Sequence, residues 1–140
     1  MADRDREIRR FERVADKRLT AATLLLDHGF HLEAVYIAGY SVECALKSLI
    51  LKRTPRKEVD VMMRRLTKVG ARGHDFEYLR GILSREPISL GIPKAIREQL
   101  QRVATWATDL RYDVNRVAFD DADRFLRATS GIRDWAKQRN

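Results

Sequence analysis

The sequence is poor in cysteine, proline and glycine. Its single cysteine, Cys44, cannot form a disulfide within the chain and cannot build a cysteine-rich zinc site. Three prolines and seven glycines are too few for an all-β protein with many tight turns, or for a low-complexity chain. These absences exclude the disulfide-rich and zinc-stapled classes and favour a helical globular protein.

Long hydrophobic runs are also absent from the sequence. No segment approaches the roughly 18 apolar residues of a membrane span, and the longest apolar stretch, around Ala34–Val42, ends at Glu43. The N-terminus is densely charged where a signal peptide would need an apolar core. We therefore expect a cytoplasmic protein with a reduced cysteine and no membrane association.

Length and charge indicate a single basic domain. The 140 residues fit one domain, with residues 1–6 expected to fray, and 44% of them are hydrophobic, enough for a core. The net charge is +8, of which the segment Lys52–Arg72 supplies +6. The residues expected to form a basic patch are Lys52, Arg53, Arg56, Lys57, Arg64, Arg65 and Lys68. Such a patch attracts phosphate backbones or an acidic protein, although a solvated helix face has the same composition.

Apolar residues recur at three- and four-residue steps along most of the chain, which predicts helices. Thr54-Pro55 is a start signal, with Thr54 as N-cap and Pro55 at the first helical position. The expected helices are Asp3–Asp27, His31–Arg53, Pro55–Val69, a short helix capped by Asp75, Pro93–Trp106, and a last helix that begins after the acidic cluster Asp120–Asp123. The segment Glu86–Ile92 is expected to be a loop. With no strand pattern present, we predict an all-α, single-domain helical bundle of five or six helices.

Common enzyme motifs are missing from the sequence. It has no GxxxxGK(S/T) or GxGxxG phosphate loop, no HExxH metal helix and no GxSxG nucleophile turn. His28, His31 and His74 show no pairing at helical spacing, so we expect no metal site and no cofactor. Cys44 lies inside an apolar helix and is expected to pack as a small hydrophobe, not to act as a nucleophile.

Two charged residues stand out on the apolar second helix. Glu43 and Lys47 are the only charged residues between Ala34 and Leu51, and their four-residue spacing puts them on one face. An ion pair at the surface of the bundle explains this spacing. We favour the alternative that they line a polar cleft, because a buried charge without partners is too costly to keep.

A polar segment between two apolar helices is the second feature. It carries Arg111, Tyr112, Asp113, Asn115 and Arg116. Neither neighbouring helix needs so many hydrogen-bonding groups. Arginine can bind a phosphate through two hydrogen bonds, and tyrosine can stack on a base or a ribose. A structural corner, in which Arg111 pairs with an acidic residue such as Glu43, is the alternative, and both interpretations can hold at once.

Three stretches of the chain carry a resemblance to a known family: Leu32–Lys47, Gly73-His-Asp75 followed by Leu79, and Trp106–Tyr112 with the helix Ala122–Trp135. In this order they resemble the second helix, the short central segment and the C-terminal half of HEPN domains. These small helical modules are named for higher eukaryotes and prokaryotes nucleotide-binding. The resemblance runs from about Ala15 to Trp135 and implies the helical bundle of that family.

The resemblance also implies a chemistry. Many HEPN domains are metal-independent ribonucleases, often toxins paired with a small nucleotidyltransferase antitoxin, and their cleft forms between two copies. They use an Arg-x4–6-His motif, and Arg111 falls on its arginine, which makes Arg111 a candidate catalytic residue. The places open to the histidine hold Arg116, Val117 and Ala118. The guanidinium of Arg116 cannot exchange protons near neutral pH, and His74 is the other candidate for the missing base.

We therefore expect a non-catalytic, HEPN-like binding or partner module that forms a homodimer and binds a nucleotide or RNA. Its expected ligand-binding residues are Arg111, Tyr112, Asp113, Arg116, Glu43 and Lys47. One alternative is an active ribonuclease toxin that uses Arg111 with an unusual proton carrier, such as His74 or Tyr112. Another is an interaction subunit that binds a nucleotidyltransferase-like protein through the basic segment and has no role in nucleic-acid binding.

Overall fold

Almost every residue of the described chain lies in a helix. The computed structural model describes residues 3–67, 76–110 and 117–139, except for the side chains of 106–110. The helices are α1 (Arg4–Asp27), α2 (His31–Lys52), the 3-10 turn η1 (Arg56–Glu58), α3 (Val59–Thr67), α4 (Phe76–Ser84), α5 (Lys94–Leu110) and α6 (Phe119–Gln138). These residues include no strand, and the predicted all-α bundle is confirmed.

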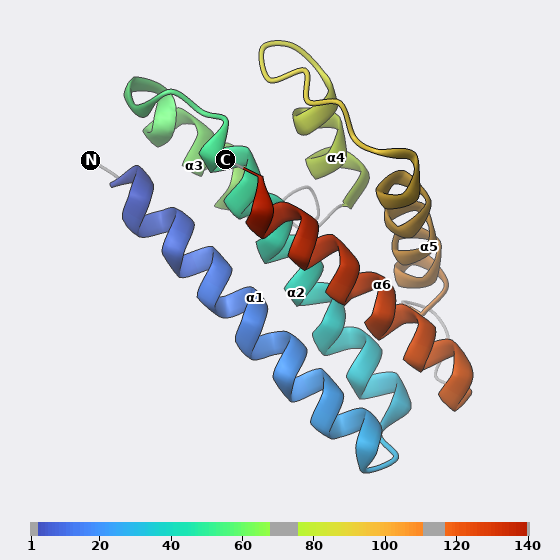
Figure 1. The fold of residues 1–140 in the computed structure, drawn as a ribbon. Coiled ribbons are helices and arrows are strands. Elements are labelled where there is room, and N and C mark those ends of the chain that lie inside the picture. The colour runs from blue at the N-terminus through green and yellow to red at the C-terminus, as the bar shows by residue number, and fades with distance from the viewer. Residues whose placement is uncertain (1–2, 68–75, 111–116, 140) are drawn as a thin grey trace.

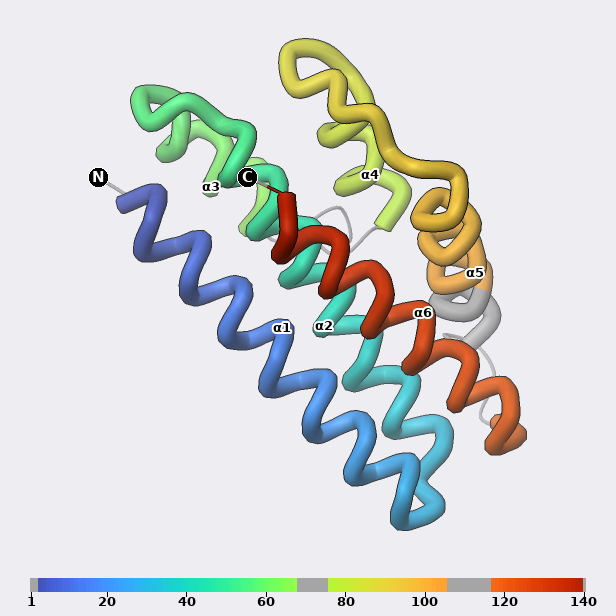
Figure 2. The backbone as a smooth tube through the Cα atoms, viewed as in Figure 1, coloured from blue at the N-terminus to red at the C-terminus, as the bar shows by residue number. Residues whose placement is uncertain are grey.

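The long helices α1, α2 and α6 form the body of the bundle. α1 and α2 are antiparallel neighbours, and α6 runs along both of them in the same direction as α2 (Figure 1). Gly29 joins α1 to α2 with a φ of 85°, a left-handed conformation that glycine adopts without steric cost. α4 and α5 lie on the side of α2 and α6 that is away from α1, and α3 lies near the end of α2 (Figure 2).

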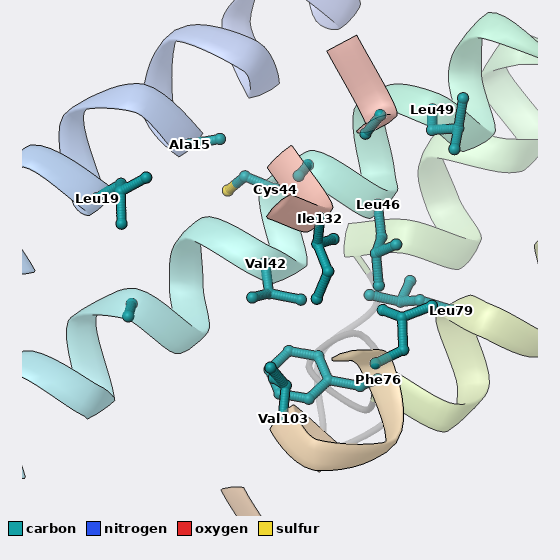
Figure 3. Close-up of a cluster of buried hydrophobic side chains, with 14 of the residues drawn as sticks. Ala15, Leu19, Val42, Cys44, Leu46, Leu49, Phe76, Leu79, Val103 and Ile132 are labelled. Carbon is teal, nitrogen blue, oxygen red and sulfur yellow. The ribbon is translucent and has the colours of Figure 1, made fainter. Parts of the chain in front are cut away.

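α2 is the central helix because it is apolar on nearly every side. By length and composition it could cross a membrane, but 78% of its most apolar window is buried inside the bundle, as in the core helix of a soluble protein. Figure 3 shows side chains from four helices meeting around it: Val42 of α2, Phe76 of α4, Val103 of α5 and Ile132 of α6. The core therefore holds α5 and α6 in a fixed relation to α2.

The N-terminal residues are fastened to the end of α2. The Asp3 carboxylate accepts hydrogen bonds from the backbone N–H groups of Asp5 and Arg6, as an N-cap does. The Arg4 guanidinium donates to the carbonyls of Leu51 and Lys52, at the C-terminal end of α2. Residues 4–6, which the sequence led us to expect as frayed, thus form a bonded first turn of α1.

Three predicted helix ends differ from those observed. Thr54 is not an N-cap: its hydroxyl donates to the Ile50 carbonyl at 2.7 Å, and α3 begins only at Val59, after η1. α5 begins at Lys94 and extends to Leu110. α6 begins at Phe119, before the acidic cluster, so Asp120 and Asp121 lie in its first turn, where the helix dipole favours negative charge. The predicted cap Asp75 and the predicted end Val69 lie outside the described residues.

Candidate functional site

Glu43 and Lys47 form a buried ion pair on α2. Lys47 Nζ lies 3.0 Å from Glu43 Oε2, and the residues are only 7% (Glu43) and 5% (Lys47) exposed. The Lys47 ammonium also lies 5.9 Å from the centre of the Phe11 ring on α1, within cation–π range. The pair is therefore not a solvated contact at the bundle surface. That it also lines a polar cleft stays a prediction.

Lys52 of the expected basic patch is built into the bundle. Its ammonium lies 3.2 Å from a Glu12 carboxylate oxygen of α1. It also donates hydrogen bonds to the carbonyls of Ala136 and Lys137, at 3.1 and 3.3 Å. The last carbonyls of a helix have no partner inside the helix, so a cation placed there satisfies them and complements the helix dipole. Lys52 thus ties together α1, α2 and the end of α6.

Of two further members of the patch, one forms an ion pair within the fold and the other is half-buried. Arg56 pairs with Asp5 at 2.9 Å, and this hydrogen bond lowers the pKa of the Asp5 carboxyl. Arg53 is half-buried, and its Nε is buried without a hydrogen-bond partner among the described residues. Lys57, Arg64 and Arg65 are exposed and form no ion pair within the part of the chain that the structure describes, while Lys68 lies outside it.

The predicted ligand-binding segment falls between two described helices. Arg111, Tyr112, Asp113 and Arg116, together with His74, lie outside the described residues. α5 ends at Leu110 and α6 begins at Phe119, so this segment must leave one helix and enter the other.

A pocket of about 540 Å³ lies between α5 and α6. Val103 of α5 and Phe125 of α6 are the large buried apolar side chains that line it. Arg102, Arg124 and Asp121 also line it, and both arginines are exposed. Neither arginine forms a hydrogen bond or an ion pair with any other described side chain. The pocket thus combines uncompensated guanidinium groups with an apolar floor.

No pattern in the sequence indicates this pocket. Arg102 and Arg124 look like ordinary solvated charges on the polar faces of two amphipathic helices. Only the packing of α5 against α6 brings the two residues to one pocket. The spacing of residues within one helix cannot predict that residues of two different helices line the same pocket.

His31, which the sequence analysis considered only as a metal ligand, has a structural role that its spacing does not indicate. Its Nδ1 lies 3.0 Å from the Val117 carbonyl, and its ring meets the Phe119 ring edge-on, with centroids 5.7 Å apart. Because a carbonyl only accepts, Nδ1 must carry the hydrogen, which in the neutral ring leaves Nε2 as an acceptor. Nε2 has no partner among the described residues. His31 thus ties the start of α2 to the residues that lead into α6.

Cys44 packs as a small hydrophobe, as the sequence predicted. It is buried, and its sulfur points toward α1 (Figure 3). Burial, with a smaller contribution from the Glu43 charge, raises the pKa of the Cys44 thiol to about 11. A thiol with such a pKa is a poor nucleophile at neutral pH. The described residues also contain no group of three side chains that could hold a metal ion.

The fold and these side chains define a small all-α domain with a basic pocket between its last two helices. The HEPN domain family model matches residues 8–139, nearly the whole chain, and the protein therefore belongs to the HEPN family. Neither the curated proteins nor the solved structures include a match to the chain. Membership of the HEPN family implies a function related to nucleotides or RNA in general terms.

Proposed function

We propose that this protein is a non-catalytic RNA-binding module that holds RNA phosphates in the pocket between α5 and α6. The observation that carries the proposal is the presence of Arg102 and Arg124 on this pocket without any carboxylate partner among the described residues. Uncompensated guanidinium groups bind phosphates through paired, charge-assisted hydrogen bonds. The net charge of +8 adds long-range attraction for a polyanion.

The rest of the pocket suits a nucleotide unit. Its volume of about 540 Å³ has room for a ribose or a base once the phosphate is held. Asp121 can accept a hydrogen bond from a ribose 2′-hydroxyl or a base amino group. In the sequence, the segment between the two helices carries residues of the same chemistry: Arg111, Tyr112 and Arg116.

The absence of a motif histidine supports binding without cleavage. Arg116, Val117 and Ala118 stand where an Arg-x4–6-His motif that begins at Arg111 would place its histidine. None of the three side chains can take up and release a proton near neutral pH. Cleavage at a ribose 2′-hydroxyl needs such a proton carrier.

Fluorescence polarisation with a labelled single-stranded oligoribonucleotide, in EDTA, tests the proposed binding. We expect Arg102→Ala with Arg124→Ala to weaken binding about tenfold or more and to lower the salt dependence by about one unit of slope per lost phosphate contact. Arg97→Ala is the matched control, because Arg97 is exposed on α5 but does not line the pocket. Equal losses in the control and the pocket variants, or no binding by the wild type at low salt, would contradict the proposal.

Metal-independent ribonuclease activity is the second candidate function, and His31 is the observation that favours it. Its Nδ1 is fixed by the Val117 carbonyl, next in the chain to the arginine-containing segment, and this leaves Nε2 able to accept a proton. A histidine held by one nitrogen has a fixed tautomer and leaves its other nitrogen for proton transfer, which is one requirement of general acid–base catalysis. Arg111 would then stabilise charge on the phosphate.

His31→Asn separates this function from binding alone. The asparagine amide can still donate to the Val117 carbonyl, but it cannot act as a base. If the protein is a ribonuclease, the wild type cleaves RNA in EDTA and the variant binds RNA without cleaving it. Intact RNA after prolonged incubation with the wild type contradicts the ribonuclease function and leaves the binding proposal in place.

The homodimer and the nucleotidyltransferase-like partner stay predictions. Several large apolar residues are exposed on α1, on α2 and at the turn between them, and they support a protein interface there. They are Leu24, Phe30, Tyr36 and Tyr40. Sedimentation or light scattering of the purified chain gives its oligomeric state directly, and a monomer at high concentration would contradict the homodimer.

A further inference from the structure

A second pocket, of about 390 Å³, lies between α3, α4 and the loop that follows α4. It shares no lining residue with the pocket between α5 and α6, and all its lining residues are described. Met62 of α3 and Ile82 of α4 are its buried apolar members, and Tyr78 and Ile88 are half-buried beside them. This pocket therefore has an apolar interior that includes an aromatic ring.

Two arginines from different elements line this second pocket. Arg65 comes from α3, and Arg85 follows the last residue of α4. Neither forms a hydrogen bond or an ion pair through its side chain with another described residue. Arg64, the neighbour of Arg65, is exposed as well but does not line the pocket. The pocket is thus lined by two arginines that form no ion pair with a described residue.

Gly81 makes room for one of these guanidinium groups. A Cβ atom at this position would lie 3.7 Å from both Cζ and Nη1 of Arg85, so the guanidinium rests over the helix surface that glycine leaves bare. A glycine inside a helix weakens that helix relative to alanine. A Cβ alone would be in ordinary contact with the Arg85 guanidinium at this distance, whereas a longer side chain at position 81 would extend into the space that the pocket occupies.

The loop wall of the second pocket is built by backbone hydrogen bonds. Ser89 N–H donates to the Arg85 carbonyl, and Leu90 N–H donates to the Leu83 carbonyl, both at 2.8 Å. Ser89 takes a φ of 46°, a left-handed conformation that is uncommon for residues other than glycine. These bonds fold the loop back onto α4, so the pocket is formed before any ligand arrives.

We propose that the pocket between α3 and α4 binds a small aromatic anion. Its carboxylate or phosphate group lies between Arg65 and Arg85, and its ring packs against Tyr78 and Met62, whose π-face and thioether both favour aromatic contacts. A pocket of about 390 Å³ is within the range that holds a small organic ligand. This site is separate from the proposed RNA-binding pocket and does not depend on it.

The carboxylates that line the pocket favour a small ligand with one anionic group over a nucleic acid. Glu77 and Glu86 line the pocket as well as the two arginines. Glu77 is paired with Arg80, which offsets part of this negative charge. A chain of phosphates crossing the pocket would bring several negative charges near these carboxylates, whereas a ligand with one anionic group brings a single charge and meets less repulsion.

Calorimetry and proton–nitrogen NMR with phenyl phosphate and benzoate as probes test the site. We expect saturable binding of at least one probe, and the tighter probe identifies the anionic group as phosphate or carboxylate. Arg65→Ala and Arg85→Ala should each weaken that binding about tenfold, while Arg64→Ala, with the same change of charge, changes it by less than about twofold. Gly81→Leu should abolish binding, although it replaces glycine by a better helix former.

Three results would overturn the proposal. They are the failure of both probes to bind saturably, an equal loss for the Arg64 and Arg65 variants, and unchanged binding by Gly81→Leu. Inorganic phosphate that binds as tightly as phenyl phosphate would overturn the aromatic part. The variant that lacks Arg102 and Arg124 should bind the probes as the wild type does, so failure of RNA binding and failure of this site are told apart.

Discussion

The buried pair Glu43–Lys47 gives a stability prediction that can be worked from the structure. Lys47→Met removes the ammonium that lies 3.0 Å from the Glu43 carboxylate and leaves a charge on a residue that is only 7% exposed. Breaking a buried pair in this way costs about 3–5 kcal/mol, a large part of the roughly 5–15 kcal/mol that stabilises a domain. With a urea m-value of about 1–3 kcal/mol/M, the unfolding midpoint should fall by roughly 2 M.

The double variant Glu43→Leu with Lys47→Met, together with the two single variants and the wild type, forms a double-mutant cycle. Replacing both charges by apolar side chains of similar size removes the buried carboxylate together with the buried ammonium, so we expect its stability to lie within about 1 kcal/mol of the wild type. Urea unfolding followed by far-ultraviolet circular dichroism measures all four proteins, with Lys57→Met as the exposed control. A loss below about 1 kcal/mol for Lys47→Met, or a double variant equal to the sum of the singles, would refute the reasoning.

Three further predictions concern single residues. Lys52→Met should lower the free energy of unfolding, measured in urea, by about 2 kcal/mol, because the carbonyls at the end of α6 lose the ammonium that donates to them. A loss as small as that of the exposed control Lys57→Met would contradict this. Cys44 should react slowly with a disulfide reagent in the native protein and rapidly in urea, because its thiol pKa is raised to about 11, and fast native reaction would show that the thiol is accessible. Arg56→Ala should raise the lowered pKa of Asp5, which NMR titration measures. The stabilisation from this carboxylate is present above its unfolded pKa and lost as the pH falls through the folded value, so the effect of Arg56→Ala on stability should vanish in acid.

Most of the fold was predictable because long amphipathic helices repeat their pattern over many residues. α1 and α2 follow from the spacing of their apolar residues, and the even apolar surface of α2 predicts its central position. The helix ends were harder to predict. Thr54, for example, can serve either as an N-cap or as a donor to the carbonyl four residues earlier. The structure uses it in the second way, which closes α2 and delays the start of α3.

The candidate site was predictable only where its residues lie in one helix. The spacing of Glu43 and Lys47 predicts their contact, but their burial depends on the packing of α1 and α6 around α2. Lys52 counts as one more basic residue in the sequence, whereas the structure places its ammonium against the end of α6. Arg102 and Arg124 line one pocket only because α5 packs against α6.

The most direct test of the proposed function is a proton–nitrogen NMR titration of the labelled protein with a short single-stranded oligoribonucleotide in EDTA. RNA binding at the pocket between α5 and α6 predicts that Arg102, Val103 and Arg124 shift progressively and saturate together, and that added salt reverses the shifts. Unchanged spectra at low salt, or shifts confined to α3 and α4, would contradict the assignment of this pocket as the RNA-binding site.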